Sequence, residues 1–328
     1  MAQKLKNSVV VITGASSGIG RATAIEFAKK RARLVLAARS EDNLDETAEE
    51  CRSFHTEVFV VPADVSREDE VQNVAEQAME KFGRIDVWVN DAGVGFYGRF
   101  EEIPSDAFRQ VIETNLFGSI YGARAALPQF RKQGRGVLIN ISSQLAFGGA
   151  AYSSAYAISK YGLRALSDTL RQEFEDDRNI HICTVYPAST DTPFFQHSGN
   201  YTGRAVKPLG SVSKPEEVAQ AIVRCAEKPK ADVLVGKSGY VTEPLHWFAP
   251  ELHSRVLSKK TEKDHFQERP SPNTKGNLFS SSEFAAKSGG WKEGSSHVGN
   301  VALGMLVGGG MWWLMRQQRR PSVSGITM

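Results

Sequence analysis

The 328-residue sequence has little cysteine and little net charge, and both shortages limit the kinds of protein that it can be. Its three cysteines, Cys51, Cys183 and Cys225, are far apart and odd in number, so we expect reduced, packed cysteines, a reducing compartment and no metal. The net charge is only +3, and residues 259–328 hold ten basic and five acidic residues, which leaves the first 258 residues slightly acidic. We therefore expect no nucleic-acid partner. The N-terminus lacks the regions of a cleaved signal peptide, so none is expected.

Short β-branched runs alternate with longer segments of helical periodicity as far as about residue 236. This alternation is typical of βαβ units, and the apolar runs predict a parallel sheet covered by helices on both faces. Right-handed crossovers then favour one doubly wound, Rossmann-type α/β domain with seven parallel strands. We predict strands at 9–13, 33–38, 57–62, 85–90, 136–141, 180–186 and 232–236. We predict helices at 18–30, 41–53, 67–82, 105–127, 153–176 and 214–227.

The pattern changes beyond residue 240. One more amphipathic helix at 243–258 would end a domain that spans residues 1–258. Residues 259–297 are rich in Ser, Gly, Lys and Glu, which predicts a flexible linker. Residues 298–315 carry no charge and precede a basic tail at 316–328. This run approaches the roughly 20 apolar residues that span a membrane, so we expect a hydrophobic helix that crosses or lies on a membrane, or docks on a partner.

A glycine-rich turn follows the first predicted strand and opens the first predicted helix. Its glycines are Gly14, Gly18 and Gly20, in the run Thr-Gly-Ala-Ser-Ser-Gly-Ile-Gly at 13–20. Glycine lets the backbone turn sharply and approach a pyrophosphate, and the helix N-terminus offers free N–H groups to that anion. The motif predicts a dinucleotide site, with a glycine-rich turn of purely structural role as the alternative.

Arg39 directly follows the second predicted strand, where an NAD-preferring site usually presents an acidic residue to the adenosine ribose. Arg21, directly after the glycine-rich turn, is a second cation that could reach the same place. Because a guanidinium suits a 2′-phosphate and gives a pair of ribose hydroxyls little advantage, we predict NADP(H) over NAD(H). The alternative is that both arginines are solvated residues at helix ends.

Tyr156 and Lys160 lie four residues apart in a predicted helix, and therefore on one helical face. We expect the ammonium to lower the pKa of the phenol from about 10 toward neutrality, which would let it exchange a proton with an alkoxide. Alone, this spacing is common as a surface pair. Thirteen residues upstream, however, Ser143 follows the fifth predicted strand at its carboxyl end, where open α/β sheets bind ligands.

Together these residues resemble the short-chain dehydrogenase/reductase family, from about residue 8 to residue 236. The motifs occur in the family's order: the glycine-rich turn, Asp64-Val65, Asn90-Asp91-Ala92-Gly93, Asn115, Ser143, Tyr156 with Lys160, and Pro187 with Thr192. The chain departs from the family at Asp91, where an asparagine is usual, and at Ala188, where a glycine is usual. Neither departure removes a catalytic group.

The resemblance implies a role for each matching residue. Tyr156 would be the acid/base, Ser143 would hydrogen-bond the substrate oxygen, Lys160 would hold the nicotinamide ribose, and Asn115 would order a water in a proton relay. The implied cofactor contacts are Gly14, Ser16, Ser17, Gly18, Ile19, Gly20, Arg21, Arg39, Asp64, Val65, Asn90, Ala92, Gly93, Tyr156, Lys160, Pro187 and Thr192.

We therefore predict an NADP(H)-dependent oxidoreductase that moves a hydride to or from a carbonyl or secondary alcohol. Phe194, Phe195, His197 and Tyr201 fall in the family's variable substrate loop, where they either line a pocket for an apolar molecule or pack the loop. The rival function is a non-catalytic NADP(H)-binding sensor or scaffold, and a nucleotide-sugar epimerase fits the glycine spacing less well. We expect a homodimer or homotetramer with a cytoplasmic catalytic domain, attached to a membrane through 298–315.

Overall fold

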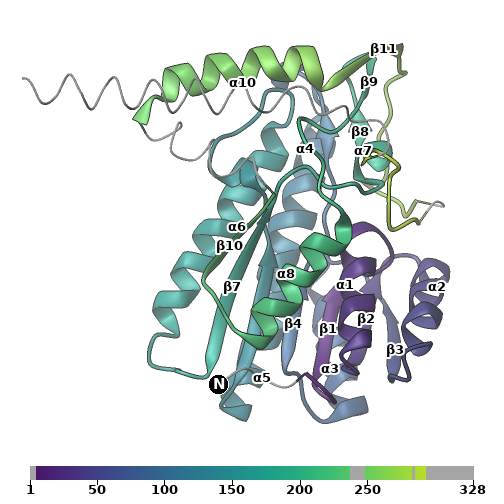
Figure 1. The fold of residues 1–328 in the computed structure, drawn as a ribbon, viewed down its shortest axis with the longest axis vertical. Helices are drawn as coiled ribbons and strands as arrows, with labels where there is room; N and C mark the ends of the chain where they lie inside the picture. Colours follow the sequence, from purple (N-terminus) through teal and green to yellow (C-terminus); the bar gives the residue numbers. More distant parts are fainter. Residues whose placement is uncertain (1–4, 237–247, 283–284, 293–328) are drawn as a thin grey trace, which may run out of the picture.

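The computed structural model describes residues 5–236, 248–282 and 285–292, and its centre is a seven-stranded sheet. The strands run in the order β10-β7-β6-β4-β1-β2-β3, and each neighbouring pair is parallel (Figure 1). They are β1 (Val9–Thr13), β2 (Arg33–Ala38), β3 (Val58–Pro62), β4 (Val87–Asn90), β6 (Gly136–Ile141), β7 (Ile180–Pro187) and β10 (Asp232–Val235). The prediction of a Rossmann-type α/β domain with seven parallel strands is confirmed.

Helices cover both faces of the sheet, and the central strand shows why. Val10 and Ile12 of β1 are buried in one core, and Val9 and Val11, which point the other way, are buried in a second core. The first core lies against α1 (Gly18–Lys29), α2 (Glu41–Arg52) and α8 (Pro215–Glu227). The second lies against α3 (Glu68–Phe82), α5 (Gly118–Gln133) and α6 (Ser154–Glu173). Burial on both faces explains the continuous apolar runs.

The helix predicted at 105–127 differs from the structure. It is divided into α4 (Ser105–Ile112), a π-helical turn (Glu113–Phe117) and α5, which continues through Pro128 to Gln133. Helical periodicity alone does not reveal a single wide turn, and such turns often lie at functional sites. The turn contains Asn115, one of the predicted site residues.

Short elements form a layer beyond the carboxyl edge of the sheet, where α10 (Pro250–Asp264) runs across the top of the molecule (Figure 1). Two small sheets pair β5 (Phe96–Tyr97) with β8 (Gly199–Asn200) and β9 (Arg204–Val206) with β11 (Phe266–Pro270). Helix α7 (Phe194–His197) lies beside them, and 3-10 turns occupy Phe100–Glu102 and Gln144–Ala146.

The prediction of a flexible linker at 259–297 is wrong for the described part of that range. Helix α10 continues past the expected domain boundary at residue 258, and β11 pairs with β9. Residues 271–282 and 285–292 then hydrogen-bond to the sheet domain, for example from Arg39 to the Asn277 carbonyl oxygen at 2.7 Å. The polar composition of this range predicted a solvated linker. Composition does not record main-chain hydrogen bonds, which any residue type can make.

Among the residues that the structure describes, no helix has the length and apolar character needed to cross a membrane. The predicted membrane segment at 298–315 and the basic tail at 316–328 lie outside those residues, so membrane attachment stays a prediction. Cys51, Cys183 and Cys225 are buried and form no disulfide, as expected for packing residues.

Candidate active site

The carboxyl ends of the sheet strands open into a cavity of about 580 Å³. Open α/β sheets bind their ligands at this edge, at the point where the strand order reverses. In this sheet that point lies between β1 and β4. The cavity wall includes most of the predicted cofactor residues: Gly14, Ser16, Ser17, Gly18, Ile19, Arg39, Asp64, Val65, Ala92, Gly93, Tyr156, Lys160, Pro187 and Thr192. The predicted substrate-binding Ser143 lies in the same wall.

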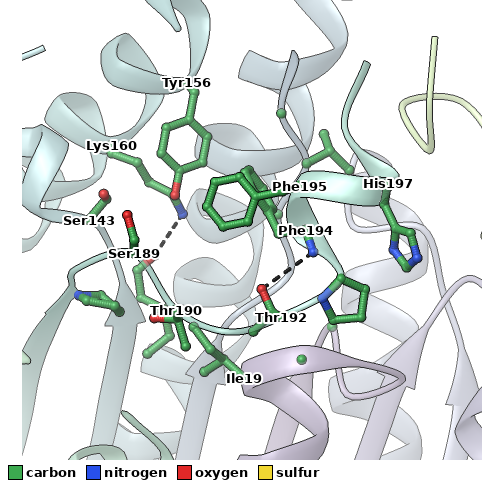
Figure 2. Close-up of a pocket in the computed structure, with 18 of the residues that line it drawn as sticks. Ile19, Ser143, Tyr156, Lys160, Ser189, Thr190, Thr192, Phe194, Phe195 and His197 are labelled. Carbon is green, nitrogen blue, oxygen red and sulfur yellow. Dashed lines mark hydrogen bonds between the residues drawn. The ribbon is translucent and has the colours of Figure 1, made fainter. Parts of the chain in front are cut away.

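The glycine-rich turn fits a dinucleotide because its glycines sit where no side chain has room. Gly14 has a φ of +72°, and a Cβ there would lie 2.7 Å from the Ala92 Cα. A Cβ at Gly20 would lie 2.2 Å from the Gly14 carbonyl oxygen. The two glycines therefore leave the backbone of the turn without side chains at the start of α1. Figure 2 shows the side chain of Ile19, which lies between Gly18 and Gly20, at the cavity.

Tyr156, Lys160 and Ser143 converge in the cavity, as Figure 2 shows. Tyr156 and Lys160 come from the first turns of α6, and Ser143 follows β6. The Lys160 ammonium donates to the Ile141 carbonyl oxygen at 2.8 Å and lies 5.5 Å from the centre of the Tyr156 ring. A phenol, a hydroxyl and an ammonium thus face one space, which is the set needed to protonate and stabilise an oxyanion.

The electrostatics differ from the expectation that Lys160 lowers the pKa of Tyr156. Burial raises the pKa of Tyr156 to about 12, while a hydrogen bond with Ser143 lowers it and the Asp91 carboxylate raises it. Burial also lowers the pKa of Lys160 to about 8, and Asp91 opposes that shift. In this state the phenol is protonated at neutral pH, which suits the donation of a proton rather than its removal.

Asp91 is the residue at which this site departs most from the family's pattern. Burial raises its pKa to about 7, and the Lys160 ammonium and the Gly20 amide oppose the rise. The Asp91 carboxylate borders the glycine-rich turn, because a Cβ added to Gly20 would lie 2.8 Å from its oxygen. The substitution of an aspartate for the usual amide therefore places a titratable group between the turn and Lys160.

Four predicted residues lie outside the cavity wall: Gly20, Arg21, Asn90 and Asn115. The Asn90 amide donates to the Asn140 side chain at 2.9 Å and to the Ser119 carbonyl oxygen at 3.0 Å, which joins β4 to β6 and α5. Asn115 is fully buried, and its amide donates to the Val94 carbonyl oxygen at 2.9 Å. Asn90 thus holds the end of β4, and Asn115 holds the loop that follows it.

The two arginines predicted to select the cofactor have different surroundings. Arg39 lies in the cavity wall, and burial lowers its pKa while the nearby Asp64 carboxylate opposes that shift. Arg21 lies outside the wall and forms ion pairs with Glu46 and Glu50, both at 3.3 Å. The charge of Arg21 is already matched by two carboxylates, so of these two arginines Arg39 is the one available to an anion in the cavity.

An aromatic wall lies beside Tyr156. The Phe194 ring is 5.5 Å from the Tyr156 ring, and Phe195 follows at 5.6 Å, with both side chains beside the catalytic group in Figure 2. His197 also lines the cavity, whereas Tyr201 packs against Phe96 at 6.4 Å. Three of the four aromatic side chains predicted in this loop therefore line the cavity, and the fourth packs the loop.

Several cavity residues were missed from the sequence. They include Asn43 of α2, Gln144 after β6, Val256, Leu257, Lys260 and Thr261 of α10, and Asn277, Ser281, Ser282 and Ala285 beyond β11. The amphipathic pattern before residue 258 indicated the helix but not its place over the cavity. Within the described residues, no group of three or more His, Cys, Asp or Glu side chains could hold a metal ion.

Comparisons with known proteins agree with this geometry. The sequence profile described as short chain dehydrogenase matches residues 8–202. The uncharacterized oxidoreductase YxnA of Bacillus subtilis is 36% identical over 272 residues, which are 82% of this chain and 76% of that protein. The 3-ketodihydrosphingosine reductase of Bos taurus is 34% identical over 249 residues, which are 74% of this chain and 75% of that protein.

Two solved structures share the fold. An alcohol dehydrogenase from Thermococcus sibiricus, complexed with 5-hydroxy-NADP, has a TM-score of 0.61 and 31% identity, with coverage of 70% of this chain and 95% of that one. A short chain dehydrogenase/reductase from Burkholderia phymatum, in complex with NAD, has a TM-score of 0.70 and 25% identity, with coverage of 76% and 96%. Proteins with this fold thus bind either type of nicotinamide cofactor.

Proposed function

This chain belongs to the short chain dehydrogenase family, whose oxidoreductases act on CH–OH groups, and we propose that it uses NADP(H). The reaction is a hydride transfer to or from a carbonyl or secondary alcohol of an apolar small molecule. The observation that carries the proposal is the convergence of Ser143, Tyr156 and Lys160 in one cavity with the glycine-rich turn. A non-catalytic binding protein would have no need of that set.

Tyr156 is the acid/base in this proposal. Its phenol holds a proton at neutral pH because its pKa is raised to about 12, so it can give that proton to the oxygen of a carbonyl undergoing reduction. Ser143 hydrogen-bonds the same oxygen and stabilises negative charge as it develops. The Lys160 ammonium lies 5.5 Å from the centre of the phenol ring, where a cation opposes, without overcoming, the rise in the pKa of Tyr156 that burial causes.

The cofactor is NADP(H) in this proposal because of Arg39. When bound, the dinucleotide supplies or accepts the hydride. The bare backbone around Gly14 and the position of the turn at the N-terminus of α1 suit its pyrophosphate, although the Gly18 amide donates to the Ala286 carbonyl oxygen and the Gly20 amide to Asp91. Arg39 directly follows β2 and lies in the cavity wall. It forms no ion pair with a carboxylate in the described residues, and a 2′-phosphate would provide its counter-charge.

An apolar substrate is supported by the wall that faces Tyr156. Phe194 and Phe195 lie on one side, and Val256 and Leu257 of α10 contribute to the same cavity. The name of the bovine relative describes a lipid-like ketone, which is a compound of this chemical class. We infer that the carbonyl lies at Tyr156 and that apolar groups extend between α7 and α10.

The experiment is an NADPH-consumption screen of the purified full-length protein against aldehydes, ketones, retinoids, steroids and acyl thioesters. The full chain is needed because α10 and the segment after β11 line the cavity. Consumption that depends on an apolar ketone supports the proposal. Tight cofactor binding without turnover of any class would favour the sensor or scaffold function.

The predicted homodimer or homotetramer has support on one helical face. Phe117, Ile158 and Tyr161 are exposed large apolar or aromatic side chains on the π-helical turn and on α6, with exposed fractions of 39%, 50% and 37%. We propose that a second copy covers this face, because such side chains are typical of interface cores. Sedimentation of the wild type and of Ile158→Asp tests this, since the variant should be monomeric.

A further inference from the structure

The segment after β11 contacts four parts of the proposed cofactor site, although its sequence predicts a linker. We call residues 271–282 and 285–292 the C-terminal strap. From β11 it passes α7 and lies above the ends of α1 and α2, where it is drawn in yellow-green in Figure 1. Asn277, Ser281, Ser282 and Ala285 of the strap lie in the cavity wall together with Arg39 and Asp64.

The first contact is at Arg39. Its guanidinium donates to the Asn277 carbonyl oxygen at 2.7 Å and to the Leu278 carbonyl oxygen at 3.3 Å. These acceptors are neutral, so they fix the direction of the guanidinium without cancelling its charge. The contrast is Arg21, which donates to the Ala285 carbonyl oxygen at 3.0 Å but also pairs with Glu46 and Glu50.

Leu278 anchors the strap at this point. Its side chain is completely buried in a cluster with Val94, Phe96 and Ala155, and apolar residues of α4 complete this cluster. The backbone before it is held by the Asn277 amide, which donates to the His197 carbonyl oxygen at 2.8 Å. The position of the two carbonyl groups that receive Arg39 is therefore set by the buried Leu278 side chain.

The strap continues past α2 and α1 to the loop after β7. The Asn43 amide donates to the Ser282 carbonyl oxygen at 3.0 Å, and the Gly18 amide donates to the Ala286 carbonyl oxygen at 3.0 Å. Asp191 then accepts from the Ser288 hydroxyl at 2.8 Å and from the Trp291 amide at 2.8 Å. The strap therefore borders the cavity at Asn277, Ser281, Ser282 and Ala285, and its Ala286 carbonyl oxygen also takes one of the amides at the start of α1.

We propose that the C-terminal strap is part of the NADP(H) site, with Leu278 as a positioning residue that acts through Arg39 to select the 2′-phosphate. The inference rests on the proposed use of NADP(H). The cofactor binds beneath the strap, and the adenosine end of the cavity is complete only when the strap is in place. Arg39 held in one direction loses little conformational freedom on meeting a phosphate, which strengthens binding of NADP(H) and not of NAD(H).

The test is a double-mutant cycle on the full-length protein with Leu278→Ala and Arg39→Ala. Dissociation constants for NADPH and NADH are measured by cofactor fluorescence, and thermal melting checks that each variant folds. Leu278→Ala should weaken NADPH about tenfold, the effect of one charge-assisted hydrogen bond, and change NADH much less. When Arg39 is already alanine, adding Leu278→Ala should leave the ratio of the NADPH and NADH dissociation constants unchanged.

Three outcomes would overturn the inference. Equal weakening of both cofactors would give Leu278 a merely structural role, and tighter NADPH binding would make the strap a competitor of the cofactor. A wild-type protein without preference for NADPH would contradict the proposed cofactor itself, and that result is read before any strap variant is made.

Limited proteolysis of the wild type keeps the inference testable if Leu278→Ala does not fold. Lys275 and Lys287 offer trypsin sites in the strap, and both take part in surface ion pairs with Asp106 and Glu216. Saturating NADPH should slow cleavage at these lysines more than NADH does, because the cofactor contacts the strap from below. Faster cleavage with NADPH would mean that the cofactor displaces the strap.

Discussion

The Lys160 ammonium lies 5.5 Å from the centre of the Tyr156 ring and donates to the Ile141 carbonyl oxygen at 2.8 Å. The two residues lie one helical turn apart on α6, and β6 supplies the carbonyl that holds the ammonium in place. Burial affects both groups more than they affect each other, since it raises the pKa of Tyr156 and lowers that of Lys160. A charged group near this buried pair, such as Asp91, should therefore have a measurable effect on the pKa of both residues.

Asp91 makes the first prediction. Burial raises its pKa to about 7 from an ordinary 3.8, so the folded protein binds this proton more tightly than the unfolded chain does. The sign follows from linkage, because stability must fall as the pH rises from about 4 to about 7. Asp91→Asn removes this fall. Melting curves should show the variant several degrees more stable at pH 8, with a smaller gap at pH 5, and a gap that does not change with pH would contradict the assignment.

Arg39 and Arg21 form a matched pair for the second prediction. Arg39→Ala should raise the KM for NADPH by about ten- to a hundredfold, the range for hydrogen bonds to a charged group, with little change for NADH. Arg21→Ala should have a much smaller effect, because its guanidinium is paired with Glu46 and Glu50 outside the cavity wall. Steady-state kinetics with both cofactors measures this, and equal effects of the two variants would reject the distinction.

The aromatic wall leads to the third prediction. Phe194→Ala removes the ring that lies 5.5 Å from Tyr156, so the KM for an apolar ketone should rise about tenfold. The KM for a small ketone such as acetone should change little. Phe100→Ala is the control, because Phe100 is 68% exposed and lies outside both the cavity wall and the strap. A loss of activity that is the same for both ketones would place Phe194 in the support of the fold instead.

Much of the sheet and the site could be predicted from the sequence, for physical reasons. Apolar strands such as β1 are buried on both faces, and glycines such as Gly14 occupy backbone positions that no other residue fits, so both leave a strong local pattern. The shared helical face of Tyr156 and Lys160 follows from spacing alone. These features depend on neighbours in the chain.

Features that depend on distant partners were missed. The pKa of Tyr156 follows from burial and from Asp91 and Ser143, which lie on other elements. The strap escaped detection because main-chain carbonyl groups, as at Asn277, make its contacts, and composition does not encode them. The π-helical turn that contains Asn115 was likewise missed, because helical periodicity does not record a single wide turn.

The central claim, that this chain reduces a carbonyl with Tyr156 as the proton donor, is tested most directly by single-residue loss of the phenol hydroxyl. NADPH consumption with the best apolar ketone is compared for the wild type, Tyr156→Phe and the control Tyr161→Phe, whose ring is 37% exposed on the same helix. Tyr156→Phe should lower kcat by at least about a hundredfold while the dissociation constant for NADPH stays nearly the same, and Tyr161→Phe should be fully active. Unaltered turnover in Tyr156→Phe would contradict the account.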